Sequence, residues 1–199
     1  MGFEIWNVFG IWNLEFGILT RLMPDPTVIL NAAAIQRALT RIAHEIAERN
    51  ETGGELALVG IQRGGVPMAQ RLSSLLAGIW GQAMAAGVLD VSMHRDDLDR
   101  RVAPTVQPTI IPFDVNGKTV VLVDDVLYSG RTIRAAMDAL NDFGRPKRIQ
   151  LAVLIDRGHR ELPITADFIG KNLPTSVGES VRVVIEEENQ PEQVVLEKP

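Results

Sequence analysis

The stretch TVVLVDDVLYSGRTIRAAMDAL, residues 119–140, decides the fold. It opens with an unbroken run of β-branched and apolar residues at 119–123, which is typical of a strand buried on both faces of a parallel sheet. Asp124 and Asp125 follow this run. A short serine–glycine turn then leads into a helix whose apolar residues recur on one face. The order of strand, turn and helix predicts an α/β fold with a mostly parallel sheet.

The turn after this strand predicts a phosphate site. A helix N-terminus presents free backbone N–H groups and the positive end of the helix dipole. Gly130 lets the backbone approach a ligand closely, and the hydroxyls of Ser129 and Thr132 are donors for phosphate oxygens. Asp124 and Asp125 would repel a phosphate, so we expect them to face sugar hydroxyls or a bound Mg²⁺. The predicted ligand is therefore a sugar phosphate at the carboxyl end of a strand.

Other phosphate-binding motifs share parts of this pattern. A strand that ends in two aspartates also occurs in Walker B strands and in metal-dependent phosphatase or receiver sites. Gly117, Lys118 and Thr119 imitate the end of a Walker A loop. Pro112 stands where that loop needs its first glycine, however, and the GKT segment precedes a strand instead of joining a strand to a helix. The P-loop interpretation is therefore disfavoured.

Length and composition indicate one ordinary globular domain. The chain has 199 residues, of which 46% are hydrophobic and 23% charged. It has no cysteine, which excludes disulfides, thiolate catalysis and cysteine-based zinc sites. The formal net charge of −5 argues against a protein that coats nucleic acid generally, but it leaves room for a local basic patch. The three histidines show no metal-ligand spacing.

The first residues differ from the rest of the chain. They are rich in aromatic side chains and nearly repeat, with IWN at 5–7 and at 11–13. Glu4 and Glu15 interrupt them and no basic segment opens them, which argues against a signal peptide and a membrane span. We expect residues 1–22 to be an extension outside the fold, from a start assigned upstream of Met23. The alternative is an amphipathic segment that packs on a partner subunit.

The remaining chain alternates helices and strands. We expect a single domain over residues 23–199, cytoplasmic and without membrane association. Asn31 is the predicted cap of a helix that runs to about residue 50, and Pro67 is the predicted first residue of the next helix. The other predicted strands are 56–61, 88–94, 148–155, 181–185 and 193–196.

The segment VVLVDDVLYSGRT resembles the motif with which type I phosphoribosyltransferases bind 5-phosphoribosyl diphosphate (PRPP). The DDVLYSGRT version is similar to that of the PyrR family, pyrimidine-operon regulators that are also uracil phosphoribosyltransferases. The segments DRGHRELP and IGKNLPTS carry the same resemblance. It implies the type I phosphoribosyltransferase fold with a small hood and a flexible loop, Mg²⁺ bound with PRPP, and a homodimer or higher homo-oligomer.

The resemblance implies two activities. One converts uracil and PRPP to UMP and diphosphate. The other is binding to the leader mRNA of pyrimidine genes, controlled by UMP or UTP. The alternative is a salvage enzyme without RNA regulation, acting on uracil or on another base such as hypoxanthine. Thr165 occupies a position where some family members carry arginine, so one basic RNA contact is absent from this chain.

The resemblance also implies site residues. Asp124 and Asp125 would bind ribose hydroxyls, or Mg²⁺ through water or PRPP. Arg95 would neutralise diphosphate from the loop that closes over PRPP, with a solvated loop charge as the alternative. His94 stands where the family often has tyrosine. The predicted phosphate-binding residues are Val126, Leu127, Tyr128, Ser129, Gly130, Arg131 and Thr132.

Three further sets follow from the resemblance. The pyrophosphate loop would be Gln62, Arg63, Gly64 and Gly65, with a plain tight turn as the alternative. The base would meet Phe168, which stacks, Ile169, which reads it through the backbone, and Asp156 nearby. For Phe168 the alternative is an ordinary core position. The RNA-binding residues would be Thr40, Arg41, His44, Arg49, His159, Arg160 and Lys171, with a solvated polar face as the alternative.

Overall fold

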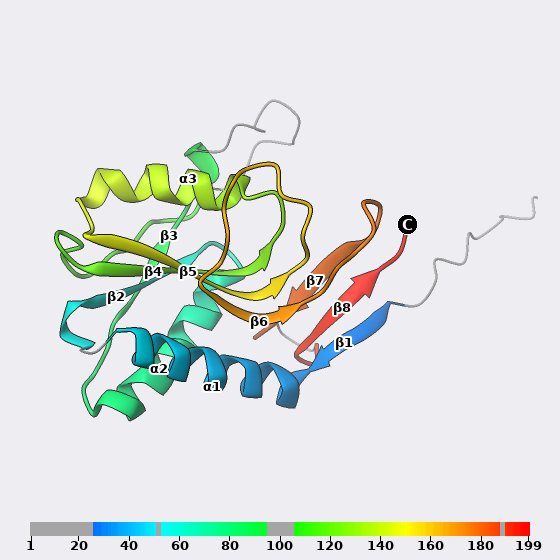
Figure 1. The fold of residues 1–199 in the computed structure, drawn as a ribbon, viewed down its shortest axis with the longest axis horizontal. Helices are drawn as coiled ribbons and strands as arrows, with labels where there is room; N and C mark the ends of the chain where they lie inside the picture. The colour runs from blue at the N-terminus through cyan, green and yellow to red at the C-terminus, as the bar shows by residue number, and fades with distance from the viewer. Residues whose placement is uncertain (1–25, 51–52, 95–105, 188–189) are drawn as a thin grey trace, which may run out of the picture.

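A five-stranded parallel sheet with helices on both faces forms the centre of the molecule (Figure 1). The structure is a computed structural model, and it describes residues 26–50, 53–94, 106–187 and 190–199. The strands are ordered β3–β2–β4–β5–β6. Their bounds are Leu56–Ile61 for β2, Ala86–Leu89 for β3, Thr119–Leu127 for β4, Arg148–Asp156 for β5 and Phe168–Asn172 for β6.

Alternate residues of the central strands face two separate cores. Val121 and Val123 of β4 face the core under helices α1 (Ala32–Arg49) and α2 (Gly65–Trp80). Val120 and Leu122 face the core under α3 (Arg131–Leu140). Because successive side chains of a strand point to opposite faces, a strand covered on both sides must be apolar throughout. This explains the unbroken apolar run that the sequence shows there.

A second, antiparallel sheet lies beside the carboxyl end of the parallel one (Figure 1). It consists of β1 (Thr27–Asn31), β8 (Gln193–Glu197) and β7 (Ser180–Val184), in that order. The guanidinium of Arg71 on α2 pairs with Glu192 and, at 3.3 Å, with Glu186. The hydrogen bond from Arg71 lowers the pKa of Glu192, although partial burial opposes that shift. These ion pairs fasten the second sheet to α2.

Several predicted boundaries are confirmed and others are wrong. Asn31 caps α1, and its side chain accepts a hydrogen bond from the Ala34 N–H at 3.0 Å. Pro67 is not the first residue of α2, which begins two residues earlier at Gly65. The strand expected at 88–94 ends at Leu89. The Asp90 carboxylate accepts a hydrogen bond from the Ser92 N–H at 2.7 Å and turns the chain away from the sheet.

No helix in the described segments combines the length and apolarity needed to cross a membrane. The predicted extension at residues 1–22 lies outside the described residues.

Candidate active site at the carboxyl edge of the sheet

Two predicted loops meet where β2 and β4 end. Gly60 of β2 pairs with Val123 of β4, so the segments that follow these strands start side by side. A Cβ atom at Gly65 would lie 2.1 Å from the Val123 carbonyl oxygen, and one at Gly64 would lie 2.2 Å from Oδ2 of Asp125. The close approach therefore requires glycine at both positions. The predicted pyrophosphate loop and the predicted PRPP motif lie in direct contact.

The rest of the predicted pyrophosphate loop is fixed by its backbone. The Gln62 N–H donates to the Leu89 carbonyl at 2.9 Å, and the peptide between Gln62 and Arg63 is cis. The Val66 N–H donates to the Arg63 carbonyl at 3.3 Å, at the start of α2. The loop is thus a turn between β2 and α2 whose N-terminal amides lie at the carboxyl edge of the sheet.

The two aspartates occupy different surroundings. Both lie within β4, which runs to Leu127 instead of ending before them. Asp124 is only 6% exposed, lines the hollow at the PRPP motif, and its Oδ1 accepts the Asp125 N–H at 3.0 Å. Asp125 lies against Gly64, and its Oδ1 accepts the Val126 N–H at 2.8 Å. In sequence the two carboxylates are neighbours. Because successive side chains of a strand point to opposite faces, Asp124 lies at the PRPP motif and Asp125 at the predicted pyrophosphate loop.

Burial shifts the titration of Asp125. Desolvation raises the pKa of this carboxyl above 3.8, and hydrogen bonds from the Val126 N–H and from Asp124 offset only part of the rise. Desolvation favours the neutral form because a charge loses hydration energy when it leaves water. A positive charge placed beside Asp125 would favour ionisation again. The site is therefore suited to a cation or to a transition state that develops positive charge.

The PRPP motif encloses a small hollow of about 90 Å³, the phosphate hollow. Its lining residues are Asp124, Val126, Leu127, Tyr128, Ser129, Gly130, Thr132 and Ile133. Gly130 has φ = 91° and is the N-cap of α3, so no side chain caps the helix from that position. The Arg131 N–H donates to Ser129 Oγ at 3.4 Å. First-turn N–H groups of α3 are thus suited to an anion in the hollow.

A hood segment, residues 157–167, is tied to the PRPP motif. The N–H groups of Glu161 and Leu162 both donate to the Ser129 carbonyl at 3.1 Å. Arg131 at the start of α3 forms an ion pair with Glu161 at 2.6 Å. The hood therefore covers the predicted phosphate loop.

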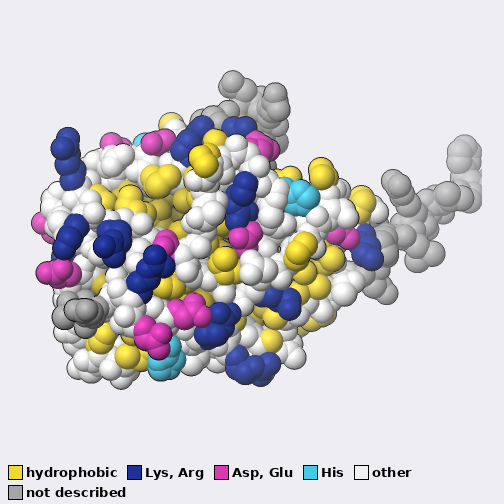
Figure 2. Space-filling model, in the orientation of Figure 1, with side chains coloured by type: hydrophobic (Ala, Val, Ile, Leu, Met, Phe, Trp, Pro, Cys, Tyr) yellow, Lys and Arg dark blue, Asp and Glu magenta, His cyan; other side chains and the backbone are white. Residues whose placement is uncertain are grey.

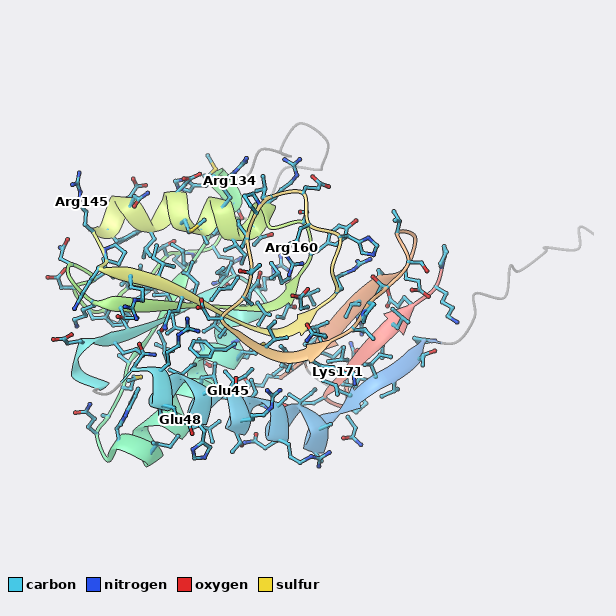
Figure 3. The ribbon with its side chains drawn as sticks, viewed as in Figure 1. Glu45, Glu48, Arg134, Arg145, Arg160 and Lys171 are labelled. Carbon is cyan, nitrogen blue, oxygen red and sulfur yellow. The ribbon has the colours of Figure 1, made fainter. Side chains whose placement is uncertain are left out.

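Arg160 fastens the hood from within (Figure 3). Its guanidinium donates to the Tyr128 carbonyl at 2.8 Å, to the Ile164 carbonyl at 2.9 Å and to the Asp156 carboxylate at 2.5 Å. These partners come from the PRPP motif, the hood and the end of β5. Arg160 thus joins the three segments that surround the site.

A larger cavity of about 330 Å³, the base cavity, opens beside the hood at the ends of β5 and β6. Its lining residues are Asp156, Arg157, Gly158, His159, Asn172, Pro174 and Thr175. The Arg157 guanidinium lies 4.3 Å from the centre of the Tyr128 ring and donates to Thr175 Oγ1 at 3.1 Å. Of the predicted base-binding residues, Asp156 lines this cavity.

Phe168 and Ile169, the other two predicted base-binding residues, do not line this cavity. Phe168 is 2% exposed in the core under α1 and pairs with Ala152, four residues before the end of β5. Arg41 donates to the Ile169 carbonyl at 3.0 Å, so that carbonyl already has a partner. The residue of β6 that reaches the cavity is Asn172, within the IGKNLPTS segment. The end of β6, not its start, therefore lines the cavity.

The predicted RNA-binding residues separate into two groups. Thr40, Arg41, His44 and Arg49 lie on α1, and Lys171 lies on the neighbouring β6 (Figure 3); together they form the α1–β6 surface. His159 and Arg160 belong instead to the hood. The His159 ring lies 2.6 Å from the Thr175 carbonyl, and Arg160 is bound as described above.

Side chains of the α1–β6 surface differ in how far they are engaged. Arg41 pairs with Glu45 at 2.7 Å, and Arg49 pairs with Asp167 at 3.1 Å. His44 and Lys171 are exposed. The surface therefore combines cations held by neighbours with side chains open to solvent.

Arg95 lies outside the described residues, but the segments that flank it are described. The Asp90 carboxylate accepts hydrogen bonds from the N–H groups of both Ser92 and Gln107. Burial alone would raise the pKa of Asp90, but its hydrogen bonds to Ser92 and Gln107 outweigh burial and lower it. Asp90 thus holds the two ends of this part of the chain together.

The donor set at the PRPP motif suits Mg²⁺ bound with a phosphate ligand. In the described part of the chain, no group of three or more His, Cys, Asp or Glu residues is arranged to hold a metal ion. Mg²⁺ prefers oxygen ligands and usually combines one or two carboxylates with substrate phosphates and water. Asp124 and Asp125 supply that number of carboxylates.

Comparison with known proteins agrees with this architecture. Residues 28–187 match the model of the phosphoribosyl transferase domain. The chain is 62% identical over 160 residues to the bifunctional protein PyrR of Roseiflexus sp. (strain RS-1), covering 80% of this chain and 87% of that protein. It is 57% identical to the protein of the same name from Pelotomaculum thermopropionicum, covering 84% and 93% respectively.

Solved structures share the fold at much lower identity. A hypoxanthine phosphoribosyltransferase from Trypanosoma cruzi aligns with a TM-score of 0.68 at 17% identity, covering 89% of this chain and 93% of that one. The Staphylococcus aureus enzyme of the same name aligns at 0.64 and 19% identity, covering 87% and 93%. At such identities the likeness concerns the fold alone, and it confirms the type I phosphoribosyltransferase architecture.

Proposed function

The chain belongs to the PyrR family of the phosphoribosyltransferases, and from that premise we propose that it transfers the phosphoribosyl group of PRPP to uracil, giving UMP and diphosphate. The observation that supports this most is the contact between Gly64 and Asp125. It joins the loop suited to diphosphate to the strand that bears the carboxylates. The base cavity opens at the end of β5, the strand next to β4. The diphosphate, the ribose and the base therefore have neighbouring binding sites.

The residues act mainly by positioning and electrostatics. The 5-phosphate of PRPP lies in the phosphate hollow, against the amides of α3. Backbone amides of the pyrophosphate loop and the Arg63 guanidinium stabilise the diphosphate as its bond to the anomeric carbon breaks. Asp124 and Asp125 favour the positive charge that develops on the ribose ring, as carboxylates do in glycosyl transfer. Uracil nitrogen then bonds to the anomeric carbon from the base cavity and loses its proton.

Mg²⁺ would be held by the PRPP oxygens together with Asp124 and Asp125, directly or through water. When bound, it neutralises charge on the leaving diphosphate. The requirement is tested by removing Mg²⁺ with EDTA and restoring it.

We propose as a second function that the protein binds pyrimidine leader mRNA and that UMP or UTP strengthens this binding. The α1–β6 surface offers Lys171 and His44 in exposed positions, where they can contact phosphates and unpaired bases. The hood touches both the nucleotide pocket and the PRPP motif through Arg160. Occupancy of one pocket would then serve both catalysis and sensing.

Purified protein with uracil, PRPP and Mg²⁺ tests the first function. We expect UMP formation, and a much lower rate with hypoxanthine. A higher rate with hypoxanthine would support the alternative of a purine salvage enzyme. If the protein forms UMP but binds no leader RNA, it is a uracil salvage enzyme without a regulatory role.

A further inference from the structure

A second hollow lies at the opposite edge of the parallel sheet, where α1 ends and β2, β4 and β5 begin. This amino-edge hollow has a volume of about 290 Å³. Its lining residues are Arg49, Asn50, Glu55, Leu56, Thr119, Lys147 and Arg148. In Figure 2 lysine and arginine side chains gather at this end of the molecule. None of these residues belongs to the active site described above.

Cations dominate the hollow. The hollow is lined by three cations, Arg49, Lys147 and Arg148, and by one carboxylate, Glu55; Arg49 also pairs with Asp167 outside the lining. Among the described residues, Lys147 and Arg148 have no ion-pair partner, whereas Arg41, Arg71, Arg131 and Arg160 each pair with a carboxylate. The whole chain is acidic, with a net charge of −5. Unpaired cations that gather in a concave site create a local positive potential, which attracts anions.

Behind the hollow, a buried amide group without a full set of partners is bound to the lining residue Asn50. Asn50 Nδ2 donates to Gln150 Oε1 at 3.0 Å. Gln150 is 2% exposed, and its Nε2 has no hydrogen-bond partner among the described residues. A buried donor left unpaired costs about 1–3 kcal/mol, so it calls for an explanation. Through its other amide atom, Gln150 holds the side chain of Asn50 in place at the hollow.

We propose that the amino-edge hollow binds a phosphate of the leader RNA backbone, so that the RNA path continues from the α1–β6 surface around the end of α1. The proposal rests on the RNA-binding function proposed above. Arg49 belongs both to that surface and to the hollow, which makes the two continuous. Arginine suits two phosphate oxygens at once, and lysine adds a point charge. The lining contains no aromatic side chain on which a base would stack, so the contact is to the backbone.

The double variant Lys147→Gln/Arg148→Gln tests the proposal. Both side chains are exposed, so we expect no change in fold, in melting temperature or in UMP formation. The matched control is Arg182→Gln/Lys198→Gln, which removes the same charge from exposed positions of the antiparallel sheet and its end. RNA affinity is measured by filter binding to a pyrimidine-leader transcript, with saturating UMP, over a salt range of about 50 to 200 mM.

We expect the Lys147/Arg148 variant to bind RNA about tenfold more weakly than the wild type at low salt. The slope of log K against log salt should become shallower by about 0.7 for each phosphate of single-stranded RNA that the variant no longer neutralises. The control variant should keep the wild-type slope. Equal slopes for wild type and the Lys147/Arg148 variant would overturn the proposal while leaving RNA binding itself intact. A wild-type protein that binds no RNA would overturn the proposed regulation and this proposal with it.

A free anion is the competing occupant. Calorimetric titration with inorganic tripolyphosphate, on protein already saturated with UMP, distinguishes it. Tripolyphosphate binding that is abolished in the Lys147/Arg148 variant, combined with unchanged RNA affinity, would assign the hollow to a free polyphosphate and overturn the RNA assignment. No tripolyphosphate binding, combined with weakened RNA affinity, supports the RNA assignment.

Discussion

At the carboxyl edge of the parallel sheet, Gly64 and Gly65 lie so close to β4 that neither position has room for a side chain; at the amino edge, Lys147 and Arg148 line an open hollow without ion-pair partners. The first edge is shaped by backbone contacts, and its polar groups are largely bound to one another. The second edge is lined by cationic side chains, of which Arg49 pairs with Asp167 while Lys147 and Arg148 have no ion-pair partner in the described chain. A site that must hold a small reactant in one orientation needs an edge fixed by backbone contacts. An edge lined by open cationic side chains suits contact with a long, flexible polyanion.

The largest effect should come from filling the contact between the pyrophosphate loop and β4. Gly65→Ala places a methyl group 2.1 Å from a backbone carbonyl, which cannot move aside as a side chain would. We expect a loss of about 3 kcal/mol or more in the free energy of unfolding. For a domain of this size that corresponds to about 6–12 °C in melting temperature by calorimetry.

Gly78→Ala in the same helix is the matched control. A Cβ atom there meets nothing within 4 Å, so the variant should be more stable by about 0.5–1 kcal/mol. If both variants melted at the same temperature, the tight construction of the carboxyl edge would be refuted.

The second effect concerns the carboxylate at that contact. Asp125→Asn should lower kcat/KM for UMP formation by about 10²–10³-fold, because a charge that favours the transition state is removed. The exposed Asp138→Asn on α3 should leave the rate unchanged and serves as the control. Steady-state kinetics measure both, and an Asp125→Asn enzyme with the wild-type rate would remove Asp125 from the proposed mechanism.

The same variant should affect stability in the opposite direction. Burial raises the folded-state pKa of Asp125 above 3.8, so its ionisation costs stability as the pH rises from 3.8 to the folded-state value, and the cost stays constant at higher pH. Below pH 3.8 the protonated wild type and the asparagine variant should be equally stable. Near neutral pH the variant should be the more stable one. Chemical denaturation at both pH values checks this, and a variant less stable at neutral pH would contradict the assigned direction.

A smaller effect, on stability, should distinguish the predicted RNA-binding residues of the hood from those of the α1–β6 surface. Arg160→Gln should lower stability by about 1–2 kcal/mol, because its carbonyl and carboxylate partners are left without their donor. Lys171→Gln, at an exposed position, should change stability by less than about 0.5 kcal/mol. It should nevertheless weaken leader-RNA binding. Thermal melts and filter binding distinguish the two, and a Lys171→Gln protein with unaltered RNA affinity would exclude Lys171 from the interface.

Residues 119–140 could be interpreted correctly from the sequence because their structure is decided locally. A continuous apolar run, a glycine that tolerates positive φ and a helical stripe specify strand, turn and helix without distant partners. The resemblance then suggested two ligand-binding loops, which lie in contact in the structure. For Phe168 the sequence left a base contact and a core position open, because its burial depends on α1, which lies more than a hundred residues earlier in the chain. Strand β1 was missed for the same reason, since its pairing partner is β8 at the other end of the chain.

The amino-edge hollow was also not foreseen. Its cations come from the end of α1 and from the start of β5, and they become neighbours only when the parallel strands align. In sequence they resemble ordinary solvated charges.

The central claim is that one nucleotide pocket, at the carboxyl edge, serves both as enzyme and as sensor. Its most direct test is the dissociation constant for a pyrimidine-leader transcript, with and without saturating UMP, on a preparation that forms UMP from uracil and PRPP. We expect UMP to tighten RNA binding by about 5-fold or more, the lower end of the usual coupling between two sites. Equal dissociation constants with and without UMP, in an active preparation, would contradict it.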